Sequence, residues 1–298
     1  MNFFDIKKDN PHSIKSFVIA FLIGATISVF LTALYFISKM NIADFTSGQN
    51  PTVQDMHGSD LINIQIISMV SLFFISTLIY SKLRSLNFYT TFDLLQKPRI
   101  PFLILGIVFA ISAFPFLVFL ENISHSFPLP QNILEWAKNQ ELNNEALFKK
   151  FFEVNSIYSF FKTFLVISIF AGICEELFFR AALQNILLKY FKNPHIAIWI
   201  QGIAFGLFHF NLYQMIPIAM IGICFGYIYY YSKNIWYTII IHAVYNGIQV
   251  VLYYLYLNNV LGFNIDNTSD VLWWQGLLSF LIASSLFYLL LQLLNKKS

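Results

Sequence analysis

Apolar runs of membrane-spanning length recur along the chain and constrain its fold more than any other feature. A transmembrane helix needs about 20 mostly apolar residues. Runs of this kind predict helices at residues 17–38, 61–81, 101–120, 157–188, 195–211, 214–231, 235–257 and 271–294. Only 11% of the residues are charged, whereas soluble domains average about 25%. The sequence therefore predicts an all-α fold, a polytopic membrane helical bundle with about eight transmembrane helices.

The distribution of positive charge predicts how these helices are oriented. Most of the 18 lysines and arginines lie in the N-terminal tail, in residues 82–100, 180–194 and 232–234, and in the C-terminal tail. Cytoplasmic loops carry the excess of Lys and Arg, so both termini are predicted to be cytoplasmic. The first apolar run is too long for a signal-peptide core and is expected to remain as a helix. We therefore expect a multi-pass protein of the plasma membrane. Its Ile-, Lys- and Asn-rich composition is compatible with a bacterial inner membrane.

The chain is expected to have two regions. Residues 1–156 form an N-terminal membrane region with three transmembrane helices and an interfacial segment, and residues 157–298 form a membrane core that bears the chemistry. Within residues 121–156, apolar positions at imperfect helical spacing alternate with glutamates, which predicts a helix on the membrane surface. A lid over a site is the alternative interpretation of this segment.

Smaller features define what else the core contains. Cys174 and Cys224 both lie in apolar runs and are predicted to be buried free thiols. Glycines four residues apart, in 202–206 and 222–226, predict close helix packing. The chain has no phosphate loop and no nucleic-acid-binding motif, so the lipid bilayer, and not nucleic acid, is the expected partner.

A few polar residues in the core cannot be explained by a membrane interface. They are Glu175, Glu176, Arg180, His209, His242 and Asn246. Ionisable groups in a bilayer are costly, so they are rare unless they pair or have a function. Glu176 and Arg180 are four residues apart on one helix and can form an ion pair, which we interpret as structural. Glu175 is rotated by about 100° from Glu176 and can face elsewhere.

This set of residue types is suited to hydrolysing an amide inside the membrane. A buried carboxylate is a competent general base for water, while histidine and asparagine donors can stabilise an oxyanion. A Gly-x-Ser-x-Gly nucleophile and a His-Glu-x-x-His zinc motif are both absent. By ligand type, Glu175, His209 and His242 could instead hold one divalent ion such as Zn²⁺.

Three motifs on successive helices resemble the CAAX protease and bacteriocin-processing (CPBP/Abi) family of intramembrane endopeptidases. They are Glu175-Glu176-x-x-x-Arg180, Phe205-x-x-x-His209 and His242-x-x-x-Asn246. The resemblance covers roughly residues 157 to 257 and implies an all-helical protease with its active site within the bilayer. Members of this family cut prenylated Cys-a-a-X proteins in eukaryotes and are linked to peptide maturation or bacteriocin immunity in bacteria. A membrane or lipidated protein or peptide is thus the expected substrate.

The resemblance also implies roles for individual residues. Glu175 corresponds to the residue that activates water, assisted by His209, and His242 with Asn246 corresponds to the oxyanion-stabilising pair. Glu176 and Arg180 have supporting roles. The same residues fit a metalloprotease or a glutamate-dependent mechanism, and we favour the version without a metal cofactor. A non-catalytic immunity or scaffold protein and a proton-coupled transporter are the competing interpretations.

Overall fold

The computed structural model describes residues 12–39, 56–152, 157–261 and 271–296. Within these residues all regular secondary structure is helical. The elements in chain order are α1 (His12–Lys39), α3 (Gly58–Met69), η3 (Val70–Ile75), α4 (Ser76–Leu83), α5 (Phe88–Thr91), α6 (Ile100–Ser112), α7 (Phe114–His125), α8 (Gln131–Phe151), α9 (Ile157–Phe164), η4 (Leu165–Phe170), α10 (Ala171–Glu176), η5 (Leu177–Gln184), α11 (Asn185–Tyr190), α12 (Pro194–Leu207), α13 (Met215–Ser232), α14 (Ile235–Leu257) and α15 (Trp273–Asn295). The elements η3, η4 and η5 are π-helical segments inside longer helices.

In the described part of the chain, seven helices are long and apolar enough to cross a membrane. They are Ser13–Lys39, Gly58–Leu83, Ile100–His125, Ile157–Tyr190, Met215–Ser232, Ile235–Leu257 and Trp273–Asn295. The predicted all-helical membrane fold is confirmed. The helix predicted at 195–211 is also present, but as α12 it has only 14 residues, fewer than the roughly 20 that a span needs.

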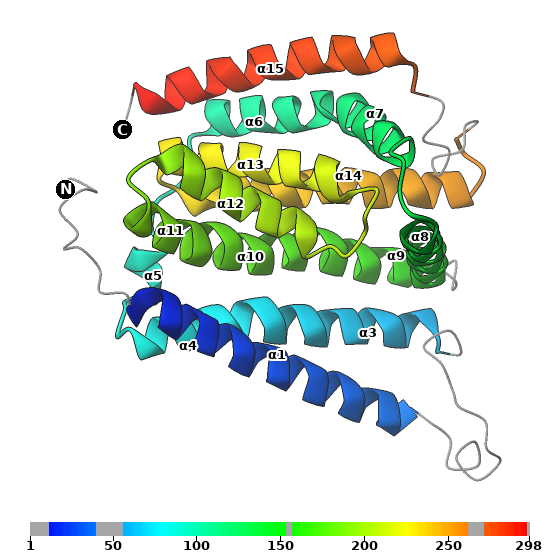
Figure 1. Cartoon of the computed structure of the whole chain (residues 1–298), viewed down its shortest axis with the longest axis horizontal. Coiled ribbons are helices and arrows are strands. Elements are labelled where there is room, and N and C mark those ends of the chain that lie inside the picture. Colours follow the sequence, from blue (N-terminus) through cyan, green and yellow to red (C-terminus); the bar gives the residue numbers. More distant parts are fainter. Residues whose placement is uncertain (1–11, 40–55, 153–156, 262–270, 297–298) are drawn as a thin grey trace.

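The long helices lie side by side along one axis, as Figure 1 shows, with α1, α3 and α4 on one side of the bundle and α6, α7 and α15 on the other. The fourth long helix, α9 to α11, and helices α12 to α14 lie between these two layers. The start of α1 and the end of α15 lie at the same end of the bundle (Figure 1), which agrees with termini on one side of the membrane.

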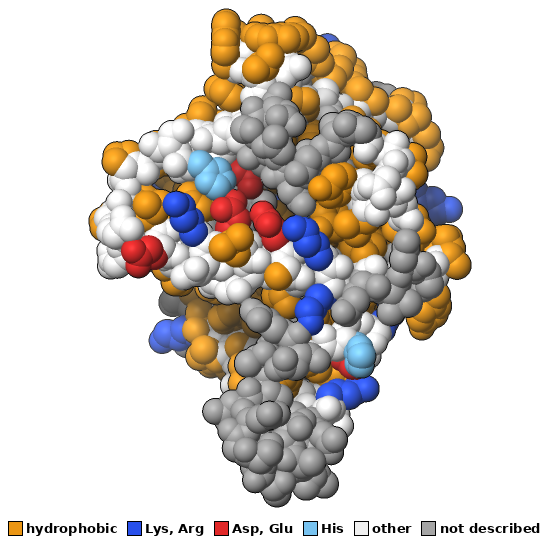
Figure 2. All heavy atoms as spheres, turned by 90° about the vertical axis from the view of Figure 1, so that its right-hand side faces the viewer, with side chains coloured by type: hydrophobic (Ala, Val, Ile, Leu, Met, Phe, Trp, Pro, Cys, Tyr) orange, Lys and Arg blue, Asp and Glu red, His pale blue; other side chains and the backbone are white. Residues whose placement is uncertain are grey.

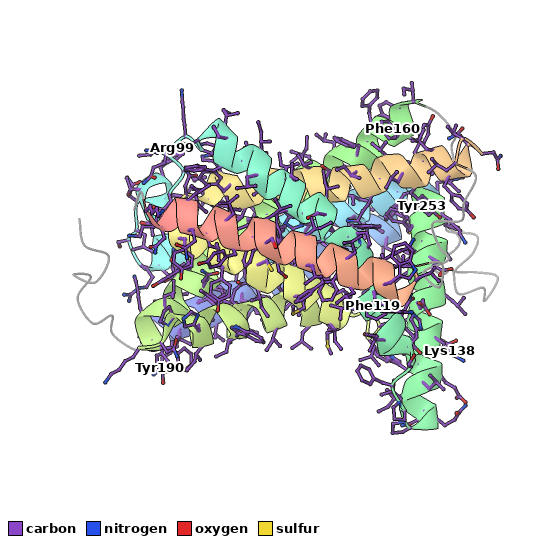
Figure 3. The ribbon with its side chains drawn as sticks, turned by 90° about the horizontal axis from the view of Figure 1, so that it is seen from above. Arg99, Phe119, Lys138, Phe160, Tyr190 and Tyr253 are labelled. Atoms are coloured by element: carbon purple, nitrogen blue, oxygen red, sulfur yellow. The ribbon has the colours of Figure 1, made fainter. Side chains whose placement is uncertain are left out.

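Helix α8 differs from the others because it crosses one end of the bundle. Figures 1 and 3 show it nearly perpendicular to the long helices, with the part around Lys138 extending beyond the side of the bundle. Its C-terminal part is anchored by Phe148, whose ring lies 4.7 Å from that of Tyr253 on α14. Trp136 and Leu142 are exposed. This position fits the surface helix that the sequence predicted within residues 121–156.

Local sequence explains where the helices break and where they approach closely. Pro115, near the start of α7, has no backbone N–H to donate to the preceding turn of α6. The long helix Ile100–His125 is therefore interrupted at Ala113, between α6 and α7. Helices α12 and α13 pack closely through glycine, since a Cβ on Gly206 would lie only 2.6 Å from the Met215 carbonyl oxygen. The predicted packing role of the 202–206 glycines is thus confirmed.

The N-terminal helices and the fourth long helix share one hydrophobic core. The ring of Phe178 on η5 lies 5.0 Å from that of Phe17 on α1 and 5.2 Å from that of Phe73 on η3. Cys174 lies in a separate cluster with Met69 and Val166 and is 3% exposed, and neither Cys174 nor the partly buried Cys224 forms a disulfide. The two cysteines are free thiols, as predicted.

Candidate active site

The two adjacent glutamates lie at the end of α10, in the middle of the fourth long helix. This short α-helical turn is flanked by the π-helical segments η4 and η5. Such π-bulges redirect side chains and are frequent at functional sites. Gly172 lets α10 approach α14 closely, because a Cβ there would lie 3.0 Å from the carbonyl oxygen of Ile239. The glutamates are thereby brought next to the helix that carries His242.

Glu176 is held by two partners in the centre of the bundle. Its Oε1 accepts a hydrogen bond from Arg180 Nη1 at 2.7 Å and lies 2.8 Å from His242 Nδ1. Glu176 and Arg180 are both 0% exposed. An ionised carboxylate can only accept hydrogen bonds. Nδ1 of His242 is therefore assigned a proton and donates the hydrogen bond to Glu176 Oε1. The ion pair between Glu176 and Arg180 forms as their spacing predicted.

Arg180 is enclosed by groups that suit a buried guanidinium. Its Nη2 donates to the Gly222 carbonyl oxygen at 3.2 Å. The guanidinium carbon lies 4.3 Å from the ring centroid of Phe205 and 5.6 Å from that of Phe225. These aromatic faces attract the cation where water does not compete. Arg180 therefore joins η5, α12 and α13 around the ion pair.

Glu175 remains without such a partner. Its side chain is 14% exposed, and its Oε2 atom lies 3.9 Å from His242 Nε2, beyond hydrogen-bonding distance. This Oε2 atom is buried and makes no hydrogen bond to the protein. A water molecule could bond to both groups across a gap of this size. Both glutamates have a buried Oε2 without a hydrogen-bond partner, but Glu176 is held through Oε1 by Arg180 and His242, whereas Glu175 faces Nε2 of His242.

His209 lies in the turn that follows α12, where it is exposed and next to Phe205. Its Nδ1 is 2.8 Å from the Phe205 carbonyl oxygen, which turns Nε2 outward from the helix. The Phe205 ring contacts both histidines, with centroid distances of 4.9 Å to His209 and 5.9 Å to His242. In the described contacts His209 makes no hydrogen bond to Glu175, so Phe205 is what connects it to the cluster.

Asn246 lies one turn beyond His242 on α14. One N–H of its amide donates to the Ile167 carbonyl oxygen at 3.1 Å. This bond to η4 fixes the side chain and leaves its second N–H available. The structure therefore places Asn246 on the same pair of helices as His242 and Glu175, without a direct contact to either carboxylate.

The donor atoms proposed for a metal ion do not converge. Glu175, His209 and His242 are not among the described groups whose three ligand atoms all lie within 4.8 Å of one another. Ligands of one zinc ion bind at about 2.0–2.2 Å, which requires closer spacing than this. In the described side-chain positions these three residues do not form such a group, and a mechanism without a metal ion stays a prediction.

Two glutamines extend the polar cluster along η5 and α12, and the sequence interpretation missed both. Gln184 follows Arg180 by four residues and donates from Nε2 to the Gly226 carbonyl oxygen at 2.9 Å. Gln201 is 0% exposed, and neither of its amide atoms has a hydrogen-bond partner in the protein. The spacing of Glu176, Arg180 and Gln184 along one helix face was a signal that could have identified Gln184.

Fold and site together define a multi-pass membrane protein with an acid–base cluster buried among its central helices. Residues 157–248 match the family described as type II CAAX prenyl endopeptidase Rce1-like. This stretch begins at α9, ends within α14 and contains all six motif residues. The resemblance inferred from the motifs is thereby confirmed over these residues. No curated protein and no solved structure matches the chain.

Proposed function

We propose that the chain is an intramembrane endopeptidase in which Glu175 activates the attacking water. One observation carries this assignment: Glu176 Oε1 is bonded to both Arg180 and His242, whereas Glu175 has no described hydrogen bond to either and its Oε2 lies 3.9 Å from His242 Nε2. Glu175 is thus the carboxylate of the pair whose Oε2 is left to bond a water molecule between it and His242. The family match over residues 157–248 supports peptide-bond hydrolysis as the reaction.

The reaction begins when Glu175 takes a proton from water. The hydroxide attacks the carbonyl carbon of the scissile peptide bond, and the carbonyl oxygen becomes an oxyanion. Glu175 then returns the proton to the leaving nitrogen as the C–N bond breaks. His209, through its outward Nε2, helps to hold the water.

The oxyanion is stabilised by donors on α14. Asn246 offers the amide N–H that is not bonded to Ile167. His242 donates to Glu176 through Nδ1, so its Nε2 becomes a second donor only when the ring carries both protons. Arg180 and Glu176 act by holding the His242 ring in place. No metal cofactor is part of this proposal.

The substrate is expected to be a membrane-embedded or lipidated protein or peptide, cut near the bilayer. The protein is expected in the plasma membrane of a bacterium with both termini in the cytoplasm. The start of α1 and the end of α15 at one end of the bundle support a common side for the termini, and the distribution of Lys and Arg is the reason to expect the cytoplasmic side. Residues 1–156 are proposed as an N-terminal membrane region, and residues 157–298 as the catalytic core.

A comparison of membrane proteomes tests the proposed function. Cells would carry the wild-type protein, Glu175→Gln, or the control Glu135→Gln, which changes a glutamate on α8 that bonds only to Gln131 among its described contacts. We expect shortened protein products in wild-type and control cells but not with Glu175→Gln. Equal amounts of all three proteins in the membrane must accompany the result. Identical products in all three would refute the protease assignment, and a phenotype that survives Glu175→Gln would favour a scaffold.

A further inference from the structure

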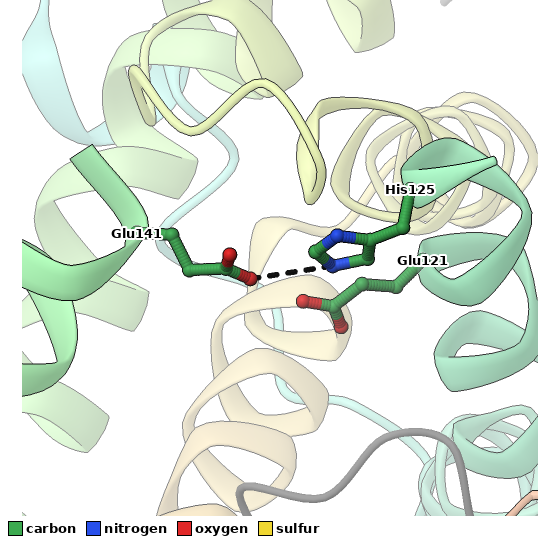
Figure 4. A group of neighbouring side chains, drawn as sticks. All are labelled: Glu121, His125 and Glu141. Atoms are coloured by element: carbon green, nitrogen blue, oxygen red, sulfur yellow. Dashed lines mark ion pairs between the residues drawn. The ribbon is translucent and has the colours of Figure 1, made fainter. Parts of the chain in front are cut away.

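A second group of ionisable side chains lies at the end of the bundle crossed by α8. Glu121 and His125 are one turn apart near the end of α7, and Glu141 reaches them from α8 (Figure 4). One ligand atom from each lies within 4.8 Å of the other two. We propose that these three residues bind a divalent transition-metal cation, for which Zn²⁺ is the best probe.

The spacing of the donor atoms suits a shared cation. His125 Nε2 lies 3.2 Å from Glu141 Oε1, and two ligands of one zinc ion at about 2.0–2.2 Å are separated by a similar distance. One carboxylate oxygen of Glu121 lies within 4.8 Å of a ligand atom of each of these two residues. Carboxylate oxygens also bind Mg²⁺ and Ca²⁺, but the imidazole of His125 favours Zn²⁺ or another transition metal over these two cations.

The charge of the group also favours a cation. Two carboxylates share one imidazole, and the partner of Glu121 among the described contacts is the neutral amide of Gln214. Figure 2 shows acidic side chains gathered beside a histidine on this end of the molecule. Both glutamates are partly buried and His125 is exposed. A cation could therefore enter from solvent and bind two carboxylates that, among the described contacts, are bonded to one imidazole and one neutral amide, with Lys138 the nearby cation that acts on Glu141.

The connection between α12 and α13 orients the donors. Gln214 Nε2 donates to Glu121 Oε1 at 2.9 Å. The ring of Tyr213 stacks on that of His125 with a centroid distance of 3.8 Å. Tyr213 is 1% exposed, and its N–H donates to Asn211 Oδ1 at 3.2 Å. Metal ligands are commonly held in this way by a second layer of residues, whereas an ordinary surface ion pair needs no such support.

The position of the group indicates a structural role for the cation. It would join α7, α8 and the α12–α13 connection, which contains His209. A bound metal would therefore hold α8 across the bundle and stiffen the segment next to His209, without taking part in the chemistry at Glu175. Metal found in the purified protein would then not by itself indicate a metalloprotease.

Equilibrium dialysis of the full-length protein in detergent against Zn²⁺, followed by metal analysis, tests the proposal. We expect one Zn²⁺ per chain in the wild type, and at least about 100-fold weaker binding in His125→Ala and Glu141→Gln. Gln214→Leu should weaken binding by about 10–100-fold through loss of ligand orientation. His195→Ala, which removes an exposed histidine bonded to Tyr227, is the matched control and should bind normally.

Two further results separate this site from the catalytic one and from misfolding. Glu175→Gln should retain full Zn²⁺ binding, and Zn²⁺ should slow tryptic cleavage at Lys138 on α8 in the wild type but not in Glu141→Gln. Wild-type affinity in both His125→Ala and Glu141→Gln would overturn the proposal. Loss of binding in Glu175→Gln would overturn it as well, because the metal would then belong to the catalytic cluster.

Discussion

Replacement of Arg180 by methionine should destabilise the protein more than any exposed substitution. Methionine keeps much of the side-chain volume but removes the bonds to Glu176 and Gly222 and the contact with Phe205. Removing one member of a buried ion pair costs about 3–5 kcal/mol, because the remaining charge is left without compensation. His242 still bonds to Glu176, so we expect the lower end, about 3 kcal/mol. At about 2–4 °C per kcal/mol, the melting temperature should fall by about 6–12 °C.

The chain itself supplies a reporter for this measurement. Cys174 is 3% exposed and free, so a thiol-reactive dye will label it only when the bundle opens. In a Cys224→Ala background, labelling during a temperature ramp in detergent gives the unfolding midpoint. Arg99→Met, at an exposed arginine, is the matched control and should change stability by no more than about 0.5 kcal/mol.

A double variant tests whether charge is the cause. Glu176→Gln combined with Arg180→Met removes both charges and should be more stable than Arg180→Met alone, with a coupling energy of about 1–3 kcal/mol. The explanation would be refuted by an Arg180→Met midpoint equal to that of Arg99→Met, or by a double variant that recovers nothing.

Three more predictions concern positions around the site. Burial raises the pKa of Asp93 from 3.8 to about 6, so the folded state favours its protonated form and loses stability as the pH rises from about 4 through 6. Asp93→Asn should therefore raise the unfolding midpoint by the equivalent of about 1 kcal/mol at pH 7.5 and have no effect at pH 4. Asn246→Ala should lower the cleavage rate by about 10²–10³, measured on a peptide substrate, with an unchanged KM. Gly172→Val should push α10 from α14 at Ile239 and lower both the midpoint and the rate, whereas unchanged values would contradict the close approach.

The sequence identified the spans well because length and hydropathy decide what can cross a bilayer. Seven described helices match predicted runs, and the helix at 195–211 was found but is shorter than expected. The π-helical segments on either side of α10 could not be predicted, since an i to i+5 hydrogen bond depends on packing by distant helices. The position of α8 across the bundle end followed only in outline from its mixed apolar and acidic pattern.

At the site, the sequence predicted the contact between residues four positions apart, but it did not predict contacts between residues far apart in the chain. The four-residue spacing predicted the ion pair between Glu176 and Arg180. The bond from His242 to Glu176 joins residues 66 positions apart, and no periodicity in the sequence indicates it. The bond that fixes Asn246 to Ile167 is of the same kind. These contacts arise from the close packing of α10 and η4 on α14.

The different roles of the two adjacent glutamates can be tested directly by measuring the cleavage rate and the unfolding midpoint of Glu175→Gln and of Glu176→Gln. Glu175→Gln should lower the rate by about 10²–10⁴, as expected for loss of a general base, and should leave the Cys174 labelling midpoint within about 2 °C of the wild type. Glu176→Gln should lower the midpoint, because it leaves Arg180 buried without its counter-charge. A Glu175→Gln protein that cleaves at the wild-type rate would contradict the assignment of Glu175 as the base.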